Sequence, residues 1–311
     1  MSKVSKDIQD SRLQRLSAFT THADGGNPAG VWIDDELPDS STMQAIAKAV
    51  GYSETAFVAP KHGYEKQIRY FSPLGEVAFC GHATIATGVA LGERGGQRGG
   101  ERSGEQGGQA VGEAVGEAEG SGRYTLSTQA GDVMLQVSVL NGTVRATLTS
   151  VLPQQKEIEP AVLQQVLQLL NWDASELDCR IPPKLAFAGA WHLVIAAGSK
   201  ARLDQLHYDF DGLKALMDSH QLTTLQLVWQ ESDTVFHARN PFPVGGVVED
   251  PATGAAAAAL GGYLRDAGLM TAPFSFDILQ GEVMGRPSLL RVDVPVEGGV
   301  DVSGGAVVID G

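Results

Sequence analysis

The amino-acid sequence predicts an α+β fold of two similar halves, each a curved, mostly antiparallel sheet wrapped around a central buried helix. Two segments, ATIATGVA over 83–90 and AAAAALGGYL over 255–264, have apolar or small residues on every face. Such helices are enclosed by other structure. A similar step precedes each of them, FCGHAT over 79–84 and EDPATG over 249–254. This internal echo predicts a duplicated unit, with a functional site in a cleft between the two halves.

Runs of β-branched and aromatic residues predict the strands, and apolar positions at helical spacing predict the helices. The predicted strands are 67–71, 133–139, 144–148, 191–196, 225–229, 289–294 and 300–309. The predicted helices are 40–50, 81–91, 161–170, 210–219 and 253–265, the first of them capped by Asp39. The first half is expected to span 12–150 and to be completed by a strand over about 300–311. The second half is expected to span 151–299.

Residues 92–122 differ from the rest of the chain, because they repeat a Gly-Glu theme, hold 12 of its 38 glycines and contain no aromatic residue. Such a segment buries too little apolar surface to offset the entropy of ordering it. The composition therefore predicts a flexible surface insertion, with a partner-binding arm as the alternative.

Charge and hydropathy exclude several classes of protein. The chain carries 23 Lys and Arg against 37 Asp and Glu, a net charge of −14, which disfavours nucleic acid as a partner. No apolar run approaches the ~20 residues that a membrane-spanning helix needs. The polar start MSKVSKDIQDSRLQ lacks the apolar core of a signal peptide, so a cytoplasmic location is expected.

The stretch VVEDPATGA over 247–255 follows two glycines and opens the second enclosed helix. Helix N-termini attract anions, because their first N–H groups have no partner within the helix and the dipole is positive there. The N–H groups from Thr253 to Ala256 are therefore candidates for holding a substrate carboxylate, with Gly254 allowing close approach. The structural alternative is that Asp250 only caps the helix, with Pro251 at its first position.

Glu54 lies in SETAF over 53–57, between a helix that ends near Val50 and an apolar strand. A loop at such a place presents its side chain into a cleft, and a partly buried glutamate with a raised pKa can exchange protons near neutral pH. The alternative is a solvated loop glutamate, which is the common case.

Among the seven histidines, His82 has the sequence context that best fits a functional role, since it follows Gly81 at a helix start. It is either a catalytic residue or a capping residue.

Motifs for other chemistries are missing from the sequence. The remaining histidines show no HxxxH or HExxH spacing, so no metal site is predicted. A GxSxG elbow and a GxxxxGK[ST] loop are absent, and no GxGxxG follows a strand outside the Gly/Glu segment. Hydrolase, nucleotide-binding and nicotinamide-dependent functions therefore lose their usual support.

Six short motifs together resemble the phenazine-biosynthesis (PhzF-like) isomerase family. They are SAFT (17–20), GNPAGV (26–31), SETAF (53–57), FSP (71–73), GHAT (81–84) and EDPATG (249–254). The resemblance runs from about Leu13 to Gly304 and Gly305, interrupted only by the Gly/Glu segment. It implies a fold similar to that of diaminopimelate epimerase, a homodimer, and a reaction on a small carboxylated metabolite that needs no cofactor.

The resemblance also implies roles for individual residues. Glu54 is expected to take a proton from one carbon and return it to another. His82 and Asp250 are expected to orient the substrate's hydroxyl and amino groups. The implied substrate-binding positions are Asn27, Gly81, Thr253, Gly254 and Ala255, with the Gly81 and Gly254 backbones holding the carboxylate.

The cysteines do not match a two-thiol racemase. Diaminopimelate epimerases use one cysteine at each helix start, and those positions are taken here to be Gly81 and Ala255. Cys80 is one residue away, which on a helix turns a side chain by about 100°, and Cys179 lies in a loop. Stereoinversion needs an acid and a base on opposite faces of the substrate, so a proton shift by a single base is preferred.

Ala255 departs from the family pattern, in which a serine commonly follows the TG of EDPxTG. The loss of that hydroxyl removes one hydrogen bond to substrate, worth about 1 kcal/mol. Two alternatives to the isomerase stay open. One is an amino-acid racemase or epimerase that opposes a carboxylate with His82 or Asp250, and the other is a non-catalytic binding protein that keeps the anion pocket.

Overall fold

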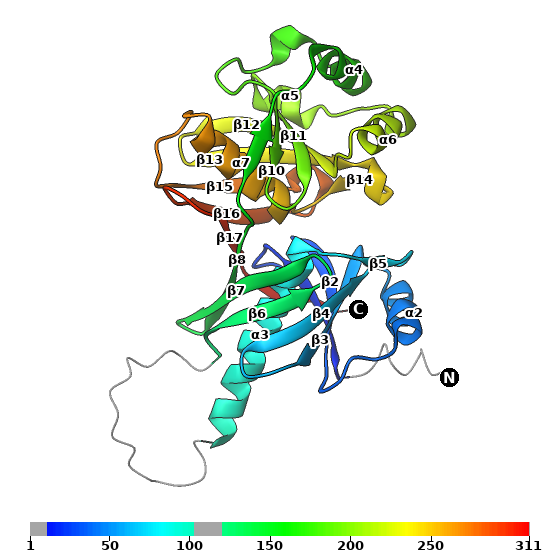
Figure 1. The fold of residues 1–311 in the computed structure, drawn as a ribbon, viewed down its shortest axis with the longest axis vertical. Coiled ribbons are helices and arrows are strands. Elements are labelled where there is room, and N and C mark those ends of the chain that lie inside the picture. Colours follow the sequence, from blue (N-terminus) through cyan, green and yellow to red (C-terminus); the bar gives the residue numbers. More distant parts are fainter. Residues whose placement is uncertain (1–10, 103–119, 311) are drawn as a thin grey trace. The chain divides into compact units, whose positions relative to one another are not determined.

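The structure is a computed structural model that describes residues 11–102 and 120–310 (Figure 1). The chain divides into two compact units. The first unit holds the residues up to Ala23, Pro28–Leu148 and the residues from Ser303 onward. The second unit holds Asp24–Asn27 and Thr149–Val302, so three strands contain residues of both units, and each of them is described below with one unit. Both units combine many strands with few helices, which confirms the predicted α+β class.

The first unit contains a mixed sheet. Its elements are β1 (Leu13–Ala18), β2 (Asn27–Ile33), α2 (Ser40–Val50), β3 (Glu54–Pro60), β4 (Glu65–Phe71), β5 (Glu76–Val77), α3 (Gly81–Arg102), β6 (Gly122–Thr128), β7 (Gly131–Leu140), β8 (Thr143–Thr149) and β18 (Ala306–Val308). Strand β3 pairs parallel with β2 and antiparallel with β4, which pairs parallel with β6. An antiparallel meander follows through β7 and β8, and β18 pairs with β1.

The strands of the second unit also pair in both parallel and antiparallel senses. Its elements are β9 (Gln154–Lys156), α4 (Pro160–Leu170), the 3-10 turn η1 (Ala174–Glu176), β10 (Lys184–Phe187), β11 (Trp191–Ala196), α5 (Lys200–Asp204), α6 (Phe210–Ser219), β12 (Thr224–Ser232), β13 (Val235–Phe242), the 3-10 turn η2 (Pro243–Gly245), β14 (Val247–Asp250), α7 (Gly254–Asp266), β15 (Phe274–Gln280), the 3-10 turn η3 (Glu282–Met284), β16 (Ser288–Val294) and β17 (Asp301–Gly304). Strand β12 pairs parallel with β11 and antiparallel with β13. Strand β13 pairs parallel with β15, which pairs antiparallel with β16.

The pairing pattern of the two units is the same, as the internal echo predicted. In the first unit the series β2, β3, β4, β6, β7 runs parallel, antiparallel, parallel, antiparallel. In the second unit the series β11, β12, β13, β15, β16 repeats those four relations. Helices α3 and α7 occupy the same place in the two series, each after a short antiparallel strand, β5 or β14. Parallel neighbours need a crossover, and these helices are the crossovers.

Helix α7 and the first turns of helix α3 are enclosed within their own units. Helix α7 contacts β9, β10, β11, β12 and β16, and its residues from Ala256 to Leu264 are all buried. Helix α3 contacts β1, β3, β7 and β18. Although α7 is apolar on every face, no helix in the described part of the chain has both the length and the hydropathy required to cross a membrane.

Helix α3 is longer than the sequence predicted. It continues to Arg102, so 92–102 of the expected insertion are helical, while 103–119 lie outside the described residues. Extending a helix costs far less than nucleating one, and α3 is already nucleated by its buried first turns. A side chain at Gly92 would meet Val144 and Val137 at 2.6 and 2.9 Å. Gly92 therefore acts as a packing residue, which composition alone does not reveal.

Surface helices cover the other side of each sheet. In the second unit, α4, α5 and α6 contribute buried residues such as Val166, Leu203 and Leu213 to one cluster with Leu193 and Leu225 of β11 and β12. In the first unit, α2 packs Met43 and Ile46 against Trp32, Phe57 and Phe71. The bounds predicted for α2 and α6 are confirmed, and Asp39 caps α2 through the Thr42 N–H. The predicted strand 300–309 is divided at Gly305 into β17 and β18.

His192 on β11 makes folding sensitive to acid. Burial lowers the pKa of this completely buried imidazole to about 4, although a hydrogen bond with the backbone of Thr224 opposes the shift. Between pH 6.5 and 4 the unfolded chain binds a proton at this site that the folded chain does not bind, so the free energy of unfolding falls as the pH falls through that window. We expect a loss of about 3 kcal/mol, complete near pH 4.

Urea unfolding at pH 7.5 and 4.5 measures this loss. His192→Leu should flatten the pH dependence by that amount, whereas His220→Gln, which changes an exposed histidine, should leave it as in the wild type. An equal pH dependence in the wild type and His192→Leu would contradict the assignment.

Candidate active site

Glu54 is held in position by the buried strand that it begins. It is the first residue of β3, where it pairs with Ala29 of the parallel strand β2. The residues that follow it on β3, from Thr55 to Ala59, are all buried, so the backbone at Glu54 is fixed by the core. Its side chain is 16% exposed. Glu54 is therefore a held, mostly buried carboxylate and not a solvated loop residue.

His82 and Cys80 meet Glu54 at the start of α3. The Nε2 atom of His82 lies 3.4 Å from Oε2 of Glu54, and the His82 side chain is 7% exposed. The Sγ atom of Cys80 lies 3.5 Å from the same carboxylate oxygen and 3.4 Å from Nδ1 of His82. Ser53 adds a hydroxyl 3.3 Å from Nε2 of His82. We call Glu54, Cys80 and His82 the Glu54 triad.

The position of Cys80 corrects the sequence analysis, which expected this thiol to point away from the site. Cys80 precedes α3, so its side chain does not follow the rotation of about 100° per residue that holds within a helix. Its carbonyl accepts hydrogen bonds from the N–H and the hydroxyl of Thr84, at 3.1 and 2.7 Å. The Thr84 hydroxyl also bonds to Tyr70, whose pKa burial raises well above its usual range. This chain of contacts holds Cys80 in place.

Asp250 is the centre of a second polar set, which lies within the second unit. It ends β14. Its Oδ1 atom accepts a hydrogen bond from Nδ2 of Asn27 at 2.7 Å, and its Oδ2 atom accepts one from the Thr253 hydroxyl at 2.6 Å. Helix α7 begins at Gly254, with Thr253 as the cap residue and Pro251 outside the helix. These contacts disfavour the simple capping role that was the alternative for Asp250.

Gln280 of β15 completes this second set. Its Nε2 atom donates to the carbonyl of Asp250 at 2.7 Å, and its Oε1 atom accepts from the Thr253 N–H at 3.2 Å. The Thr253 N–H, which the sequence analysis offered to a substrate carboxylate, thus already has an acceptor. The N–H groups of Gly254 and Ala255 stand in the first turn of α7, where no carbonyl of the helix can accept from them. They are the better candidates for an anion.

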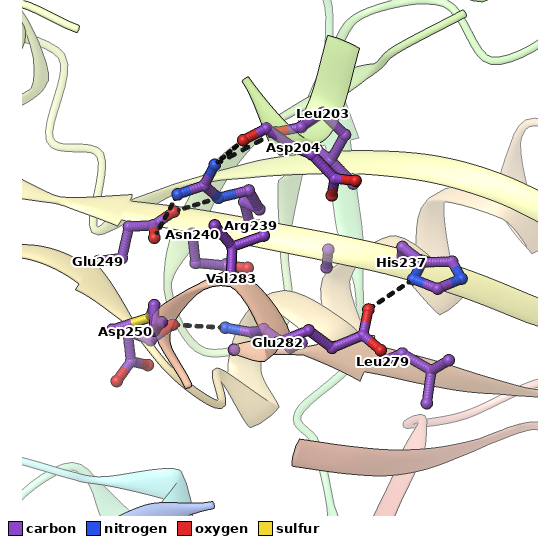
Figure 2. A pocket seen from close by; sticks show the side chains of 14 residues that line it. Leu203, Asp204, His237, Arg239, Asn240, Glu249, Asp250, Leu279, Glu282 and Val283 are labelled. Atoms are coloured by element: carbon purple, nitrogen blue, oxygen red, sulfur yellow. Dashed lines mark hydrogen bonds and ion pairs between the residues drawn. The ribbon is translucent and has the colours of Figure 1, made fainter. Parts of the chain in front are cut away.

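A buried ion pair supports β14 from the side of β13. Figure 2 shows Arg239 between Glu249 and the ends of Leu203 and Asp204. Arg239 donates to both carboxylate oxygens of Glu249, at 2.6 and 2.7 Å, and to the carbonyl of Asp204 at 2.7 Å. The Glu249 side chain is 5% exposed. Glu249 of the EDPATG motif therefore has a structural role next to Asp250.

Asn27→Ala tests whether the Asp250 carboxylate depends on its amide partner. The amide nitrogen of Asn27 is buried and donates to Oδ1 of Asp250 and, at 3.2 Å, to the carbonyl of Ala252. We expect the variant to lose about 2 kcal/mol of unfolding free energy, since a hydrogen bond to a charged group is worth about 1.5–3 kcal/mol. Asn27→Asp should lose more, because it places a second carboxylate against the first. Chemical denaturation at pH 7 compares them; equal stability of all three proteins would contradict the prediction.

The predicted site residues thus fall into two sets, each within one unit. The structure brings Glu54 and His82 together at the start of α3, beside Gly81. It brings Asn27, Asp250 and Thr253 together before Gly254 and Ala255 of α7. Sequence reasoning missed the Cys80 contacts and Gln280; Cys80 was visible in the FCGHAT step, whereas Gln280 carried no signal. The triad brings together a thiol, an imidazole and a carboxylate, three types of metal ligand, although the sequence contains no metal-binding spacing motif.

A family model and several relatives of this chain point to one family. A family model described as phenazine biosynthesis-like protein, PhzC-PhzF, matches residues 16–311. An uncharacterized isomerase, YfhB of Bacillus subtilis (strain 168), is 27% identical over 96% of this chain and 97% of its own. A trans-2,3-dihydro-3-hydroxyanthranilate isomerase of Pseudomonas chlororaphis is 29% identical over 88% and 87%. The crystal structure of a PhzF-family protein of Bacillus anthracis, 23% identical, superposes with a TM-score of 0.78 over 96% of both chains.

Proposed function

Because the chain belongs to the phenazine biosynthesis-like (PhzC-PhzF) family of isomerases, we propose that it shifts a proton on a small carboxylated metabolite with Glu54 as the single acid and base. The substrate class is a carboxylate that also bears an amino or hydroxyl group. The Pseudomonas chlororaphis relative is named for a substrate of this kind, a hydroxylated dihydroanthranilate. No cofactor enters the proposal.

The environment of Glu54 is the observation that carries the proposal. A general acid and base must hold one orientation and lie within reach of the proton that it transfers. Glu54 meets the first requirement through the core strand β3, and its carboxylate is 16% exposed, in contact with His82 and Cys80. A mostly dry carboxylate interacts more strongly with a bound substrate than a hydrated one does.

The proposed reaction is a proton shift along a short conjugated system. The Glu54 carboxylate takes a proton from an activated carbon. The electron pair of the broken C–H bond forms a new double bond, and the electrons of the original double bond move to a second carbon. The protonated Glu54 then returns the proton to a second carbon, which regenerates the carboxylate. His82, in contact with Oε2 of Glu54, would orient the carboxyl group during both transfers and contact a polar substituent of the substrate.

The second polar set is suited to the polar groups of such a substrate. Asp250 offers a carboxylate for an amino or hydroxyl group, and Asn27 and Thr253 hold it in one orientation. The first N–H groups of α7, on Gly254 and Ala255, suit a substrate carboxylate. Ala255 offers no hydroxyl, so the backbone carries this contact.

An exchange experiment in D2O tests the proposal. The protein is incubated with trans-2,3-dihydro-3-hydroxyanthranilate and with a panel of chiral amino acids, and proton NMR follows each. We expect a shifted double bond in the first compound; any deuterium, taken up where the protonated Glu54 exchanges with solvent before it returns the proton, should appear only at the carbon that receives the proton. Exchange of an α-proton with inversion and without a bond shift would identify a racemase instead. Binding without any exchange would identify the non-catalytic binding protein.

A further inference from the structure

The Glu54 triad joins three side chains that are ligands of transition metals. It offers a thiol from Cys80, an imidazole from His82 and a carboxylate from Glu54, and their ligand atoms all lie within 4.8 Å of one another. We propose that the triad is a binding site for Zn²⁺ or a similar borderline-soft divalent cation. A bound cation would occupy the carboxylate that moves the proton, so the same site would make the isomerase sensitive to inhibition by zinc.

The distances within the triad fit one face of a tetrahedron. Zinc bonds of about 2.3 Å to sulfur and about 2.0–2.2 Å to nitrogen and oxygen place tetrahedral ligand atoms roughly 3.4–3.6 Å apart. Oε2 of Glu54 lies 3.5 Å from Sγ of Cys80 and 3.4 Å from Nε2 of His82. The third edge, from Sγ to Nε2, measures 3.9 Å. Only this edge has to shorten, by a few tenths of an ångström.

The donor set selects the kind of cation. Thiolate and imidazole ligands favour zinc and related transition metals, whereas magnesium and calcium require oxygen ligands. A thiolate and a carboxylate together supply two negative charges to the ion. The positive end of the α3 dipole opposes a cation only weakly compared with two ligand charges at bonding distance.

The protein holds these donors before any ion arrives. Glu54 is fixed by β3, His82 stands in the first turn of α3, and Cys80 is held through its carbonyl by Thr84. Cys80 and His82 are 8% and 6% exposed, so few water molecules compete for them. The partly exposed Glu54 leaves a fourth position to water or to an oxygen of the substrate. Three protein ligands and one exchangeable ligand make an accessible zinc site.

Metal binding is tested first by itself, on the untagged full-length protein after treatment with a chelator. Co²⁺ is titrated as a spectroscopic probe, and Zn²⁺ is titrated by calorimetry. We expect one equivalent of Co²⁺ to give a thiolate-to-cobalt charge-transfer band that Zn²⁺ abolishes. Zinc affinity should rise with pH, because the ligands must lose their protons.

Two ligand variants and one control locate the site. Cys80→Ser should abolish the charge-transfer band. Cys80→Ser and Glu54→Gln should each lower zinc affinity by more than about 100-fold, since replacing a residue that only hydrogen-bonds to a metal ligand already lowers metal affinity by about 10–100-fold. Cys179→Ser changes the other cysteine, which is exposed and outside the triad, and should leave both readouts unchanged. A missing band, or a band lost in Cys179→Ser and kept in Cys80→Ser, would overturn the site.

The inhibition by zinc rests on the proposed function, and its failure can be told apart from failure of the site. If Zn²⁺ binds the triad and turnover continues at saturation, the site stands and the role of Glu54 as the acid and base is refuted. If neither metal binds while Glu54→Gln abolishes turnover, the proposed function stands and the metal site is refuted.

Discussion

Replacing Glu54 with Gln is expected to lower turnover by about 10²–10⁴-fold, the contribution typical of general acid-base catalysis. The amide keeps the shape of the side chain but cannot take up a proton near neutral pH. Because Glu54 begins a core strand through backbone contacts that the amide preserves, the unfolding free energy should change by less than about 1 kcal/mol. Initial rates of product formation and chemical denaturation measure the two effects.

Two observations separate a catalytic effect from a general one. Glu65→Gln makes the same change at an exposed position at the start of β4 and should retain full activity. Glu54→Gln should still bind a carboxylated product analogue, since the first turn of α7 is unchanged. A variant that turns over at the wild-type rate would rule out Glu54 as the proton carrier.

Replacing Arg239 with Met is expected to cost about 3–5 kcal/mol of unfolding free energy. The substitution leaves the carboxylate of Glu249, which is 5% exposed, without the guanidinium that donates to both of its oxygens. It also removes the hydrogen bond to the carbonyl of Asp204. A buried charge without its partner is penalised far more than an exposed one, so this should be among the most destabilising substitutions in the second unit. Urea unfolding measures the loss.

An exposed ion pair supplies the matched comparison. Lys214 and Asp218 lie 2.7 Å apart on α6 with side chains 41% and 55% exposed, so Lys214→Met should cost no more than about 0.5 kcal/mol. Removing both buried charges, in Arg239→Met with Glu249→Leu, should recover part of the loss, because no unpaired charge then remains. Similar losses of unfolding free energy in Arg239→Met and Lys214→Met would refute the claim that burial makes the Arg239–Glu249 pair important.

Local patterns predicted the elements whose sequence and surroundings agree. The amphipathic helices α2 and α6 have the predicted bounds, because capping residues and apolar spacing are properties of a few neighbouring residues. The two enclosed helices and the doubling of the fold could also be predicted, since a helix without a polar face has to be surrounded. Strand β13 escaped prediction: its VFHARNPF sequence carries His237, Arg239 and Asn240, which fit a strand only through partners on other elements.

The residues of the candidate site also divide into those that local sequence predicted and those that it did not. The motifs predicted Glu54, His82 and Asp250, because each of them stands where a helix or strand begins or ends, and such ends are visible in the chain. The direction in which Cys80 points, the acceptor for the Thr253 N–H and the place of Gln280 could not be predicted. Each of these depends on a partner far away in the sequence.

The sequence by itself determined the fold class, the two enclosed helices and the family, because apolar periodicity and short motifs are read within a dozen neighbouring residues. Only the tertiary structure decided that a thiol, an imidazole and a carboxylate share one site, and that Glu249 belongs to a buried ion pair. The physical reason is that a side chain's contacts depend on where distant strands bring their ends, which the pairing of the whole sheet decides.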